Sequence, residues 1–187
     1  MLRRDEYKQY PICDTDIWVY ACLGGIEDKL ISTYGKLVMA DVVVQEINGW
    51  NKEDYKYDYI HKKFQKYARS GQIIVIHHTD IPENEKQVLE LNLYSYGFSN
   101  GFENLPKEEH KGEIVSAMYA DNFNIPILAS NDNAFKEGGD AFEEFGHLTV
   151  YDWNKIAKIV TKNDKERIKL IVNVDRQQIA MKKCSNN

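Results

Sequence analysis

The sequence predicts an α/β fold of the Rossmann-like, three-layer α/β/α type, in which helices cover both faces of a central, mainly parallel sheet. Short apolar runs rich in β-branched residues alternate along the chain with longer segments of helical character. That alternation favours parallel strands, because each strand must return through a helix before the next one begins. The length of 187 residues suits one such domain with a sizeable core.

The first predicted strand and helix meet at an acidic residue. Residues 12–13 begin a short buried strand that runs into Asp14, and the following segment WVYACL is typical of a helix. The glycine pair at 24–25 ends that helix, because glycine accepts the positive φ of a helix C-terminus. Residues 36–40 form either a second strand or the lead into a helix, and Asp41 fits the N-cap of the helix VVVQEINGW.

The later elements follow from periodicity, β-branched content and the positions of glycine and proline. Residues 72–77 have the composition of a strand, and Pro82 opens a helix that Gly97 ends. The other predicted elements are helices over residues 55–69 and 107–122, a strand over 124–130, a helix through Phe135, a strand over 147–152 and a helix from Trp153.

The end of the chain differs in charge from the rest. Residues 161–187 carry seven basic and three acidic side chains, although the whole protein has a formal charge of −5. We therefore divide the chain into a domain of residues 1–160 and a basic C-terminal extension of residues 161–187. The segment RIKLIVNV within the extension fits a strand or part of a long helix, and periodicity does not decide between them.

The composition limits the functions that this chain can have. Its net negative charge argues against strong nonspecific attraction to nucleic acid but is compatible with an enzyme that has a local basic groove. The three cysteines are odd in number and lack metal-site spacing, and Cys13 and Cys22 fit the core of a protein in a reducing compartment. The N-terminal segment has no apolar run, and no stretch is long enough to cross a bilayer. We therefore expect a cytoplasmic protein without a membrane partner.

Four carboxylates stand where a buried segment meets a turn or the start of a helix. They are Asp14, Glu46, Glu113 and Asp132. Acids at the ends of parallel strands gather on one edge of the sheet, where they repel one another unless a cation neutralises them. Carboxylate oxygens favour hard divalent ions such as Mg²⁺ or Mn²⁺. The sequence therefore predicts a site for Mg²⁺ or Mn²⁺ at this edge.

The chain length between the last two acids allows them to meet. From Glu113 the predicted helix runs about ten residues, or roughly 15 Å, and the next strand returns roughly 15–20 Å to Asp132. Asp16 lies two residues after Asp14, so it is either a fifth metal-binding acid or a cap of the first helix. Ser130 lies two residues before Asp132, from where its hydroxyl can hydrogen-bond a metal-binding carboxylate.

These residues resemble the motifs of the PIN-domain family of metal-dependent nucleases. The family shows an apolar-Asp-Thr opening, a Glu in an early helix, a Gly-Glu pair that opens a later helix, and a Ser-Asn-Asp segment with a following phenylalanine. The pieces occur here in that order, and the resemblance covers roughly residues 10–155. The matching residues are Asp14-Thr15, Glu46, Gly112-Glu113, Ser130-Asn131-Asp132 and Phe135.

The resemblance implies a PIN-like domain that cleaves RNA, or in some members structured DNA, with Mg²⁺ or Mn²⁺. It assigns Asp14, Glu113 and Asp132 as metal ligands and Glu46 as a ligand or the residue that positions the attacking water. Many members of the family are toxins that an antitoxin protein inhibits. An RNA substrate, an antitoxin-like inhibitor and a second copy of the chain in a homodimer are thus the candidate partners. The inserted segment 83–106 and the basic extension depart from the compact toxin pattern, which argues against a toxin role.

Two other functions stay open. Asp14-Thr15-Asp16 also fits the D-x-D motif of a haloacid-dehalogenase-type phosphatase, in which Asp14 would be the nucleophile and Asp16 the general acid. That class needs a lysine at the site and a later pair of acids, which this sequence does not clearly supply. The second alternative is a catalytically silent PIN-like scaffold that binds a protein or RNA, although such a module has no need of clustered acids.

The histidines and one aromatic helix are interpreted mainly as structural. His77 and His78 are adjacent and face opposite sides of a strand, so they form no simple chelating pair, and one ring is expected to be partly buried. His110 and His147 are interpreted as isolated. The aromatic and basic segment 55–67 is a candidate surface for RNA, although half-buried helices with lysines at their edges share this pattern.

Overall fold

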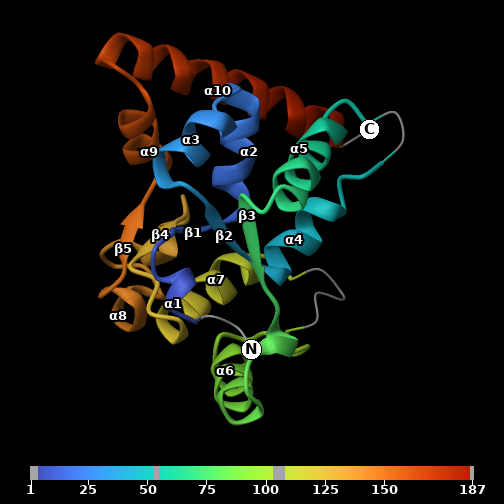
Figure 1. The fold of residues 1–187 in the computed structure, drawn as a ribbon, viewed down its shortest axis with the longest axis vertical. Helices are drawn as coiled ribbons and strands as arrows, with labels where there is room; N and C mark the ends of the chain where they lie inside the picture. The colour runs from blue at the N-terminus through green and yellow to red at the C-terminus, as the bar shows by residue number, and fades with distance from the viewer. Residues whose placement is uncertain (1–3, 53–54, 103–107, 186–187) are drawn as a thin grey trace.

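A single parallel sheet forms the centre of the computed structural model, which describes residues 4–52, 55–102 and 108–185. The sheet has the strand order β3-β2-β1-β4-β5, and all neighbouring strands within it are parallel. Helices flank it on both sides (Figure 1), so the predicted Rossmann-like α/β fold is confirmed. The strands are β1 Ile12–Cys13, β2 Leu37–Ala40, β3 Ile73–Ile76, β4 Ile127–Ala129 and β5 Thr149–Tyr151.

The helices connect successive strands and supply most of the remaining core. Among the described residues, no helix is both long enough and apolar enough to span a membrane. The α-helices are α1 Arg4–Tyr7, α2 Thr15–Gly24, α3 Glu27–Tyr34, α4 Asp41–Asn48, α5 Asp58–Arg69, α6 Glu83–Ser95, α7 Lys111–Asn122, α8 Phe142–Phe145, α9 Trp153–Val160 and α10 Asp164–Ser185. Two 3₁₀ turns, η1 His78–Asp80 and η2 Asn133–Phe135, complete the elements.

Large aromatic side chains fill the space on both faces of the sheet. Helices α2, α3, α5 and α9 lie on one side of the sheet and α7 lies on the other (Figure 1). Trp18 on α2 is fully buried and meets the edge of the Tyr67 ring at a centroid distance of 5.8 Å. On the other face, Tyr119 on α7 is fully buried beside Phe123. Burial of each such side chain stabilises the fold by roughly 1.5–3 kcal/mol.

The strand order creates a switch point between β1 and β4. From the centre of the sheet, β2 and β3 extend to one side of β1, whereas β4 and β5 extend to the other. In open parallel sheets a crevice forms outside the carboxyl ends of the two strands at such a point. Asp14 directly follows β1, and its backbone N–H donates to the carbonyl oxygen of Ala129 at the end of β4 at 3.0 Å. The sheet therefore holds the first acid beside the strand that leads to Asp132.

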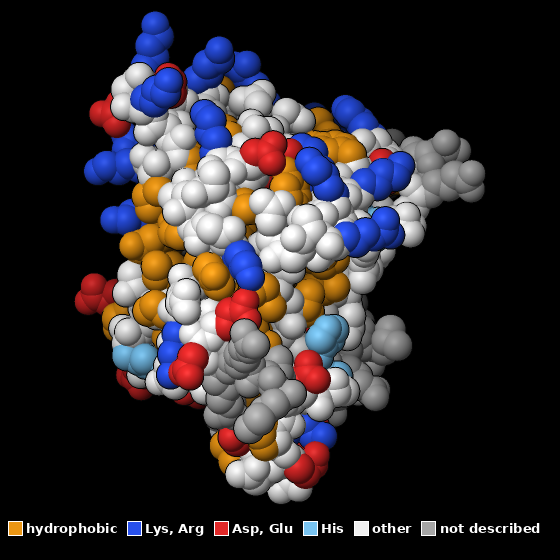
Figure 2. Space-filling model, in the orientation of Figure 1, with side chains coloured by type: hydrophobic (Ala, Val, Ile, Leu, Met, Phe, Trp, Pro, Cys, Tyr) orange, Lys and Arg blue, Asp and Glu red, His pale blue; other side chains and the backbone are white. Residues whose placement is uncertain are grey.

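The segment RIKLIVNV, for which strand and helix were both open, is helical. It belongs to α10, a helix of 22 residues that packs along α2. Gln177 Nε2 donates to the carbonyl oxygen of Leu23 at 3.0 Å, and Gln178 Nε2 donates to Tyr20 Oη at 3.0 Å. The two helices thus run in opposite directions, and the end of α10 approaches the start of α2. Lys and Arg side chains are concentrated over α10 (Figure 2).

Several predicted boundaries need correction. Helix α7 begins at Lys111 instead of residue 107, because His110 has φ 63° and ψ 2°, which a right-handed helix does not allow. Residue 107 itself lies outside the described residues. The helix predicted through Phe135 is only the 3₁₀ turn η2, and α5 begins at Asp58 instead of residue 55.

Asp41 is not the N-cap that the sequence predicted. Ala40 holds that position with an extended backbone, and Asp41 is the first residue of α4. The buried carboxylate of Asp41 accepts hydrogen bonds from its neighbour Val42, from the backbone N–H of His78 at 2.8 Å, and from Tyr119 Oη at 3.2 Å. It also contacts His78 Nδ1 at 2.6 Å. Asp41 therefore ties α4, η1 and α7 together.

The adjacent histidines have the predicted contrast in burial. His77 is exposed, whereas the ring of His78 is half-buried and stacks on Phe102 with a centroid distance of 5.4 Å. The prediction of one partly buried ring is confirmed.

Candidate metal centre

Asp14 is the most deeply buried acid at the switch point. It is the N-cap of α2, and its Oδ1 accepts a hydrogen bond from the backbone N–H of Thr15. Its Oδ2 accepts a hydrogen bond of 3.0 Å from Ser130 Oγ. Only 2% of its surface is exposed. The capping role and a role in ion binding are compatible, because a carboxylate has more lone pairs than these two donors use.

Ser130 connects Asp14 with Asp132. While its hydroxyl donates to Asp14, it accepts a hydrogen bond of 3.2 Å from the backbone N–H of Asp132. The hydrogen bond to a site carboxylate that the sequence predicted for Ser130 is therefore present. Asp132 is the N-cap of η2, and its Oδ1 accepts from the N–H of Ala134 at 2.7 Å. Its Oδ2 is directed toward α7.

Glu113 and His110 meet Asp132 from the start of α7. His110 Nδ1 lies 2.9 Å from Asp132 Oδ2 and 3.6 Å from Glu113 Oε1. One potential ligand atom from each of these three residues lies within 4.8 Å of the other two. The predicted return of the chain from Glu113 to the level of Asp132 is thus observed.

Glu46 approaches the same place from α4. Its Oε2 accepts a hydrogen bond from Thr15 Oγ1, the residue that follows Asp14. Its Oε1 lies so close to Gly112 that a β-carbon on this glycine would be 3.0 Å away. The half-buried carboxylate of Glu46 is therefore held between the start of α2 and the start of α7.

Crowding of the acids opposes their ionisation. Burial raises the pKa of Asp14 well above its usual range, and the carboxylates of Glu113, Asp16 and Glu46 raise it further, against the hydrogen bond from Ser130. The protein thus holds Asp14 where its negative charge is unfavourable without a nearby cation.

The other acids of the cluster feel the same repulsion. Burial raises the pKa of Glu113, and the charges of Asp132 and Glu46 add to this effect, whereas His110 lowers it. Asp16 is exposed in the first turn of α2, yet partial burial raises its pKa, against the lowering effect of Lys182 on α10. Asp16 therefore lies at the rim of the cluster, on the side facing the end of α10.

A hard divalent cation fits this set of side chains. The donors are carboxylate oxygens and one imidazole nitrogen, which come from four different parts of the fold and lie close together. Mg²⁺ and Mn²⁺ bind such oxygen-rich sites, and their charge would relieve the repulsion that raises the pKa of Asp14 and Glu113. Among the described residues, His110, Glu113 and Asp132 form the compact group that could hold the ion, and Asp14 and Glu46 lie beside this group.

The sequence did not reveal one contributor to this site, His110, or the positioning roles of two others, Thr15 and Gly112. His110 was interpreted as isolated, which is wrong, because it contacts both Asp132 and Glu113. The spacing H-x-x-E was the available signal, since residues three apart at a helix start lie on the same side. Thr15 and Gly112 belong to the motifs that the sequence revealed, but their contacts with Glu46 join distant segments and could not be predicted from it.

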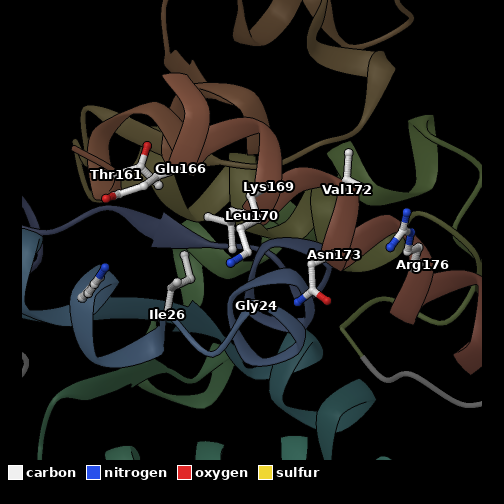
Figure 3. Close-up of a pocket in the computed structure, with 10 residues that line it drawn as sticks. Gly24, Ile26, Thr161, Glu166, Lys169, Leu170, Val172, Asn173 and Arg176 are labelled. Atoms are coloured by element: carbon white, nitrogen blue, oxygen red, sulfur yellow. The ribbon is translucent and has the colours of Figure 1, made fainter. Parts of the chain in front are cut away.

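A cleft of about 510 Å³ opens beside the cluster. His110 and Asp132 line it. Residues from the segment before α8, such as Gly139, and from the segment after α6, such as Phe98, complete the lining. A second cleft, of about 540 Å³, lies between α10 and the end of α2 around Gly24 (Figure 3). None of the clustered acids lines this second cleft. Of these two clefts, the one next to His110 is the one that borders the acidic cluster.

Comparisons with known proteins do not identify the class to which this protein belongs. No protein-family model matches this chain, and no curated protein is significantly similar to it. The fold and the site together define a Rossmann-like α/β protein with a cluster of four acids and one histidine at the switch point of a parallel sheet.

Proposed function

We propose that this chain is a metal-dependent nuclease of the PIN type, an endoribonuclease that hydrolyses phosphodiester bonds with Mg²⁺ or Mn²⁺. One observation carries the proposal: Asp14, Glu46, Glu113 and Asp132 come from separate elements and converge outside the carboxyl ends of β1 and β4. The order and the elements on which these acids occur are those of the PIN family, which supports RNA as the substrate.

The chemistry follows from charge. A phosphodiester is negative, so a cluster of bare carboxylates would repel it. A divalent ion, when bound, reverses the local potential, lowers the pKa of a coordinated water and stabilises the charge that develops on phosphorus oxygens. Asp14, Glu113 and Asp132 would hold that ion. Ser130 fixes the orientation of Asp14, because its hydroxyl is itself fixed by the N–H of Asp132.

Glu46 is suited to orient the attacking water. Thr15 Oγ1 occupies one oxygen of its carboxylate, and the other oxygen lies at Gly112, next to the start of α7. Each carboxylate oxygen has two lone pairs, so a carboxylate that is already held by hydrogen bonds can accept one more from water. Glu46 would therefore accept a proton from that water or hold the water in line with the scissile bond.

Basic side chains near the cluster favour a polyanionic substrate. On α10, Lys182 lies one turn beyond Gln178, and Asp16 on α2 lies one turn before Tyr20, the residue that Gln178 contacts. Lys182 is accordingly close enough to lower the pKa of Asp16. A phosphate backbone that crosses the rim of the cluster would meet this lysine, and phosphate contacts of that kind position a nucleic acid without reading its sequence.

The test is cleavage of total cellular RNA in the presence of Mn²⁺, with and without a chelator, followed by mapping of the new ends. The wild type should cleave, and chelation, Asp14→Asn or Asp132→Asn should each lower the rate at least about a hundredfold while circular dichroism stays unchanged. Asp121→Asn is the matched control, because Asp121 is an exposed acid on α7 that pairs with His147 away from the cluster. Undiminished cleavage by Asp14→Asn would refute the proposal.

The same purified protein distinguishes the proposed nuclease from the two alternative functions, a phosphatase and a silent scaffold. A haloacid-dehalogenase-type phosphatase would hydrolyse small phosphate monoesters without cutting RNA. The charges that act most strongly on Asp14 are carboxylates, where that class of enzyme places a lysine, so we expect no such activity. A silent scaffold would show no uptake of Mn²⁺ that depends on Asp14 in titration calorimetry.

A further inference from the structure

We propose that His110 supplies a nitrogen ligand to the divalent ion of this centre, and that this ligand makes the site prefer Mn²⁺ to Mg²⁺. This inference rests on the proposed function, because it requires an ion at the acids. It adds which ion the site prefers. It concerns a residue that the motif resemblance does not include.

The distances place the ring of His110 among the carboxylates. Two atoms that each bind one ion at about 2.1 Å can be separated by at most roughly 4.2 Å. His110 Nδ1 lies 2.9 Å from Asp132 Oδ2 and 3.6 Å from Glu113 Oε1, so both pairs already meet this limit. All three atoms lie within 4.8 Å of one another. Small rotations of the side chains are enough to direct all three at one ion.

His110 has an unusual backbone conformation at the start of α7. Its φ of 63° and ψ of 2° lie in the left-handed region, which is unfavourable for a residue with a side chain. Among the described residues, only Asn124 is another non-glycine residue with positive φ. Glycine would avoid this cost at position 110, but glycine has no ring. Strain of this kind persists where the surrounding structure or a function maintains it.

The ring is also accessible to an ion. His110 keeps 67% of its side chain exposed, whereas Glu113 and Asp132 keep 18% and 16%. The ring borders the cleft of about 510 Å³ that opens beside the cluster. An ion that enters through this cleft would meet the imidazole before it reaches Asp14, which lies deeper.

An imidazole ligand favours Mn²⁺ over Mg²⁺, because the two ions differ in how readily they accept a nitrogen ligand. Mg²⁺ is small, loses its water reluctantly and is bound in proteins almost entirely through oxygen. Transition-metal dications accept nitrogen ligands more readily. Replacement of one oxygen ligand by His110 therefore raises affinity for Mn²⁺ without an equal gain for Mg²⁺.

The decisive measurement is pulsed electron paramagnetic resonance of the Mn²⁺-loaded full chain. A directly bound imidazole produces modulation from ¹⁴N, which carboxylates and water do not. We expect this modulation in the wild type and its loss in His110→Asn, with a fall in Mn²⁺ affinity of about tenfold or more and a change in Mg²⁺ affinity of less than about threefold. Asparagine tolerates positive φ, so the variant keeps the turn before α7.

His147→Asn is the matched control. His147 is likewise exposed and likewise 2.9 Å from an aspartate oxygen, that of Asp121, but it lies outside the cluster. This variant should keep the ¹⁴N modulation and the wild-type affinity. His110→Gly is a second test variant, because glycine suits φ 63° and should leave the fold intact or more stable.

The outcomes separate this inference from the proposed function. If Mn²⁺ binds in a manner that depends on Asp14 but the wild type shows no ¹⁴N modulation, the role of His110 is overturned and the nuclease proposal stands. Modulation that survives in both His110 variants also overturns it. If neither ion binds to the wild type, the metal centre itself is wrong, and both proposals fail together.

Discussion

The carboxylate of Glu46 packs against Gly112 so closely that a β-carbon at position 112 would lie 3.0 Å from Glu46 Oε1 and 3.4 Å from its carboxyl carbon. Such contacts are tighter than those that a β-carbon ordinarily makes. The absence of a side chain at the second residue of α7 therefore allows an acid from α4 to reach the acids of α7 and η2. Glycine at this position serves the approach of the two helices, not a special backbone conformation.

Gly112→Ala should displace Glu46 and weaken the site. The added methyl group would push the carboxylate away, and the hydrogen bond from Thr15 Oγ1 would lengthen or break. We expect the rate of RNA cleavage to fall about tenfold to a hundredfold, because a misplacement of about 1 Å near the reacting groups has an effect of that size. The fold should persist, since alanine has the higher helix propensity.

A double-mutant cycle checks the cause of that loss. In a Glu46→Ala background the space beside Gly112 is empty, so Gly112→Ala should have little further effect on Mn²⁺ affinity measured by calorimetry. Equal effects in both backgrounds would show that the alanine acts by another route, such as a shift of α7.

Ser130→Ala should weaken ion binding, because protons would compete more strongly with the ion for the carboxylate of Asp14. The hydroxyl of Ser130 donates to Asp14 and lowers the pKa of that carboxyl, so its removal should raise the pKa further. Mn²⁺ affinity should fall about tenfold near neutral pH, and the pH at which binding is half-maximal should move upward. Ser116→Ala is the matched control, because Ser116 is a buried serine whose hydroxyl has no hydrogen-bond partner among the described residues. A shift of similar size in this control would contradict the role of Ser130.

Metal-free protein should be destabilised by its own Asp14 as pH rises. The folded-state pKa of Asp14 is raised, so its contribution to stability is complete below the unfolded pKa of about 4 and is lost as pH rises through the folded pKa. Asp14→Asn removes this loss. We expect the variant to gain stability over the wild type as pH increases, by about 1.4 kcal/mol for each unit of pKa shift. Urea unfolding in a chelator, at several pH values above about 4, measures this difference. Parallel stability curves would contradict the expectation.

Asp41→Ala should damage the fold and spare the metal centre. The carboxylate of Asp41 accepts hydrogen bonds from His78 and Tyr119, and both donors would lose their partner. We expect a loss of about 2–4 kcal/mol in the free energy of unfolding, with Mn²⁺ affinity of the folded protein unchanged. Asp121→Ala removes the exposed pair with His147 and should cost at most about 1 kcal/mol. A large fall in Mn²⁺ affinity for Asp41→Ala would place Asp41 in the site.

Features encoded by neighbouring residues were predictable from the sequence. The strands at residues 73–76 and 127–129 follow from β-branched and apolar content, and Asp14 and Asp132 follow directly from the strands that precede them. The helix ending at Gly25 follows from the positive φ that glycine permits. Each of these signals lies within a few residues of the feature that it predicts.

Features that depend on contacts between distant segments were not predictable in this way. The role of Asp41 depends on donors 37 and 78 residues away in the chain, and that of His110 on Asp132, 22 residues away. The segment RIKLIVNV was ambiguous because α10 has apolar residues on two sides: Val174 is buried against α2, whereas Ile168 is exposed. A helix that is apolar on both sides has no single period to recognise.

The neighbouring positions of β1 and β4 in the sheet also determine when the acidic cluster can form during synthesis. Ser130 and Asp14 are 116 residues apart in the chain, yet they share a hydrogen bond. During synthesis the first two acids leave the ribosome long before β4 is available to dock beside β1. Until that docking the nascent polypeptide lacks the complete acidic cluster, so the nuclease activity proposed above would be absent from a growing chain.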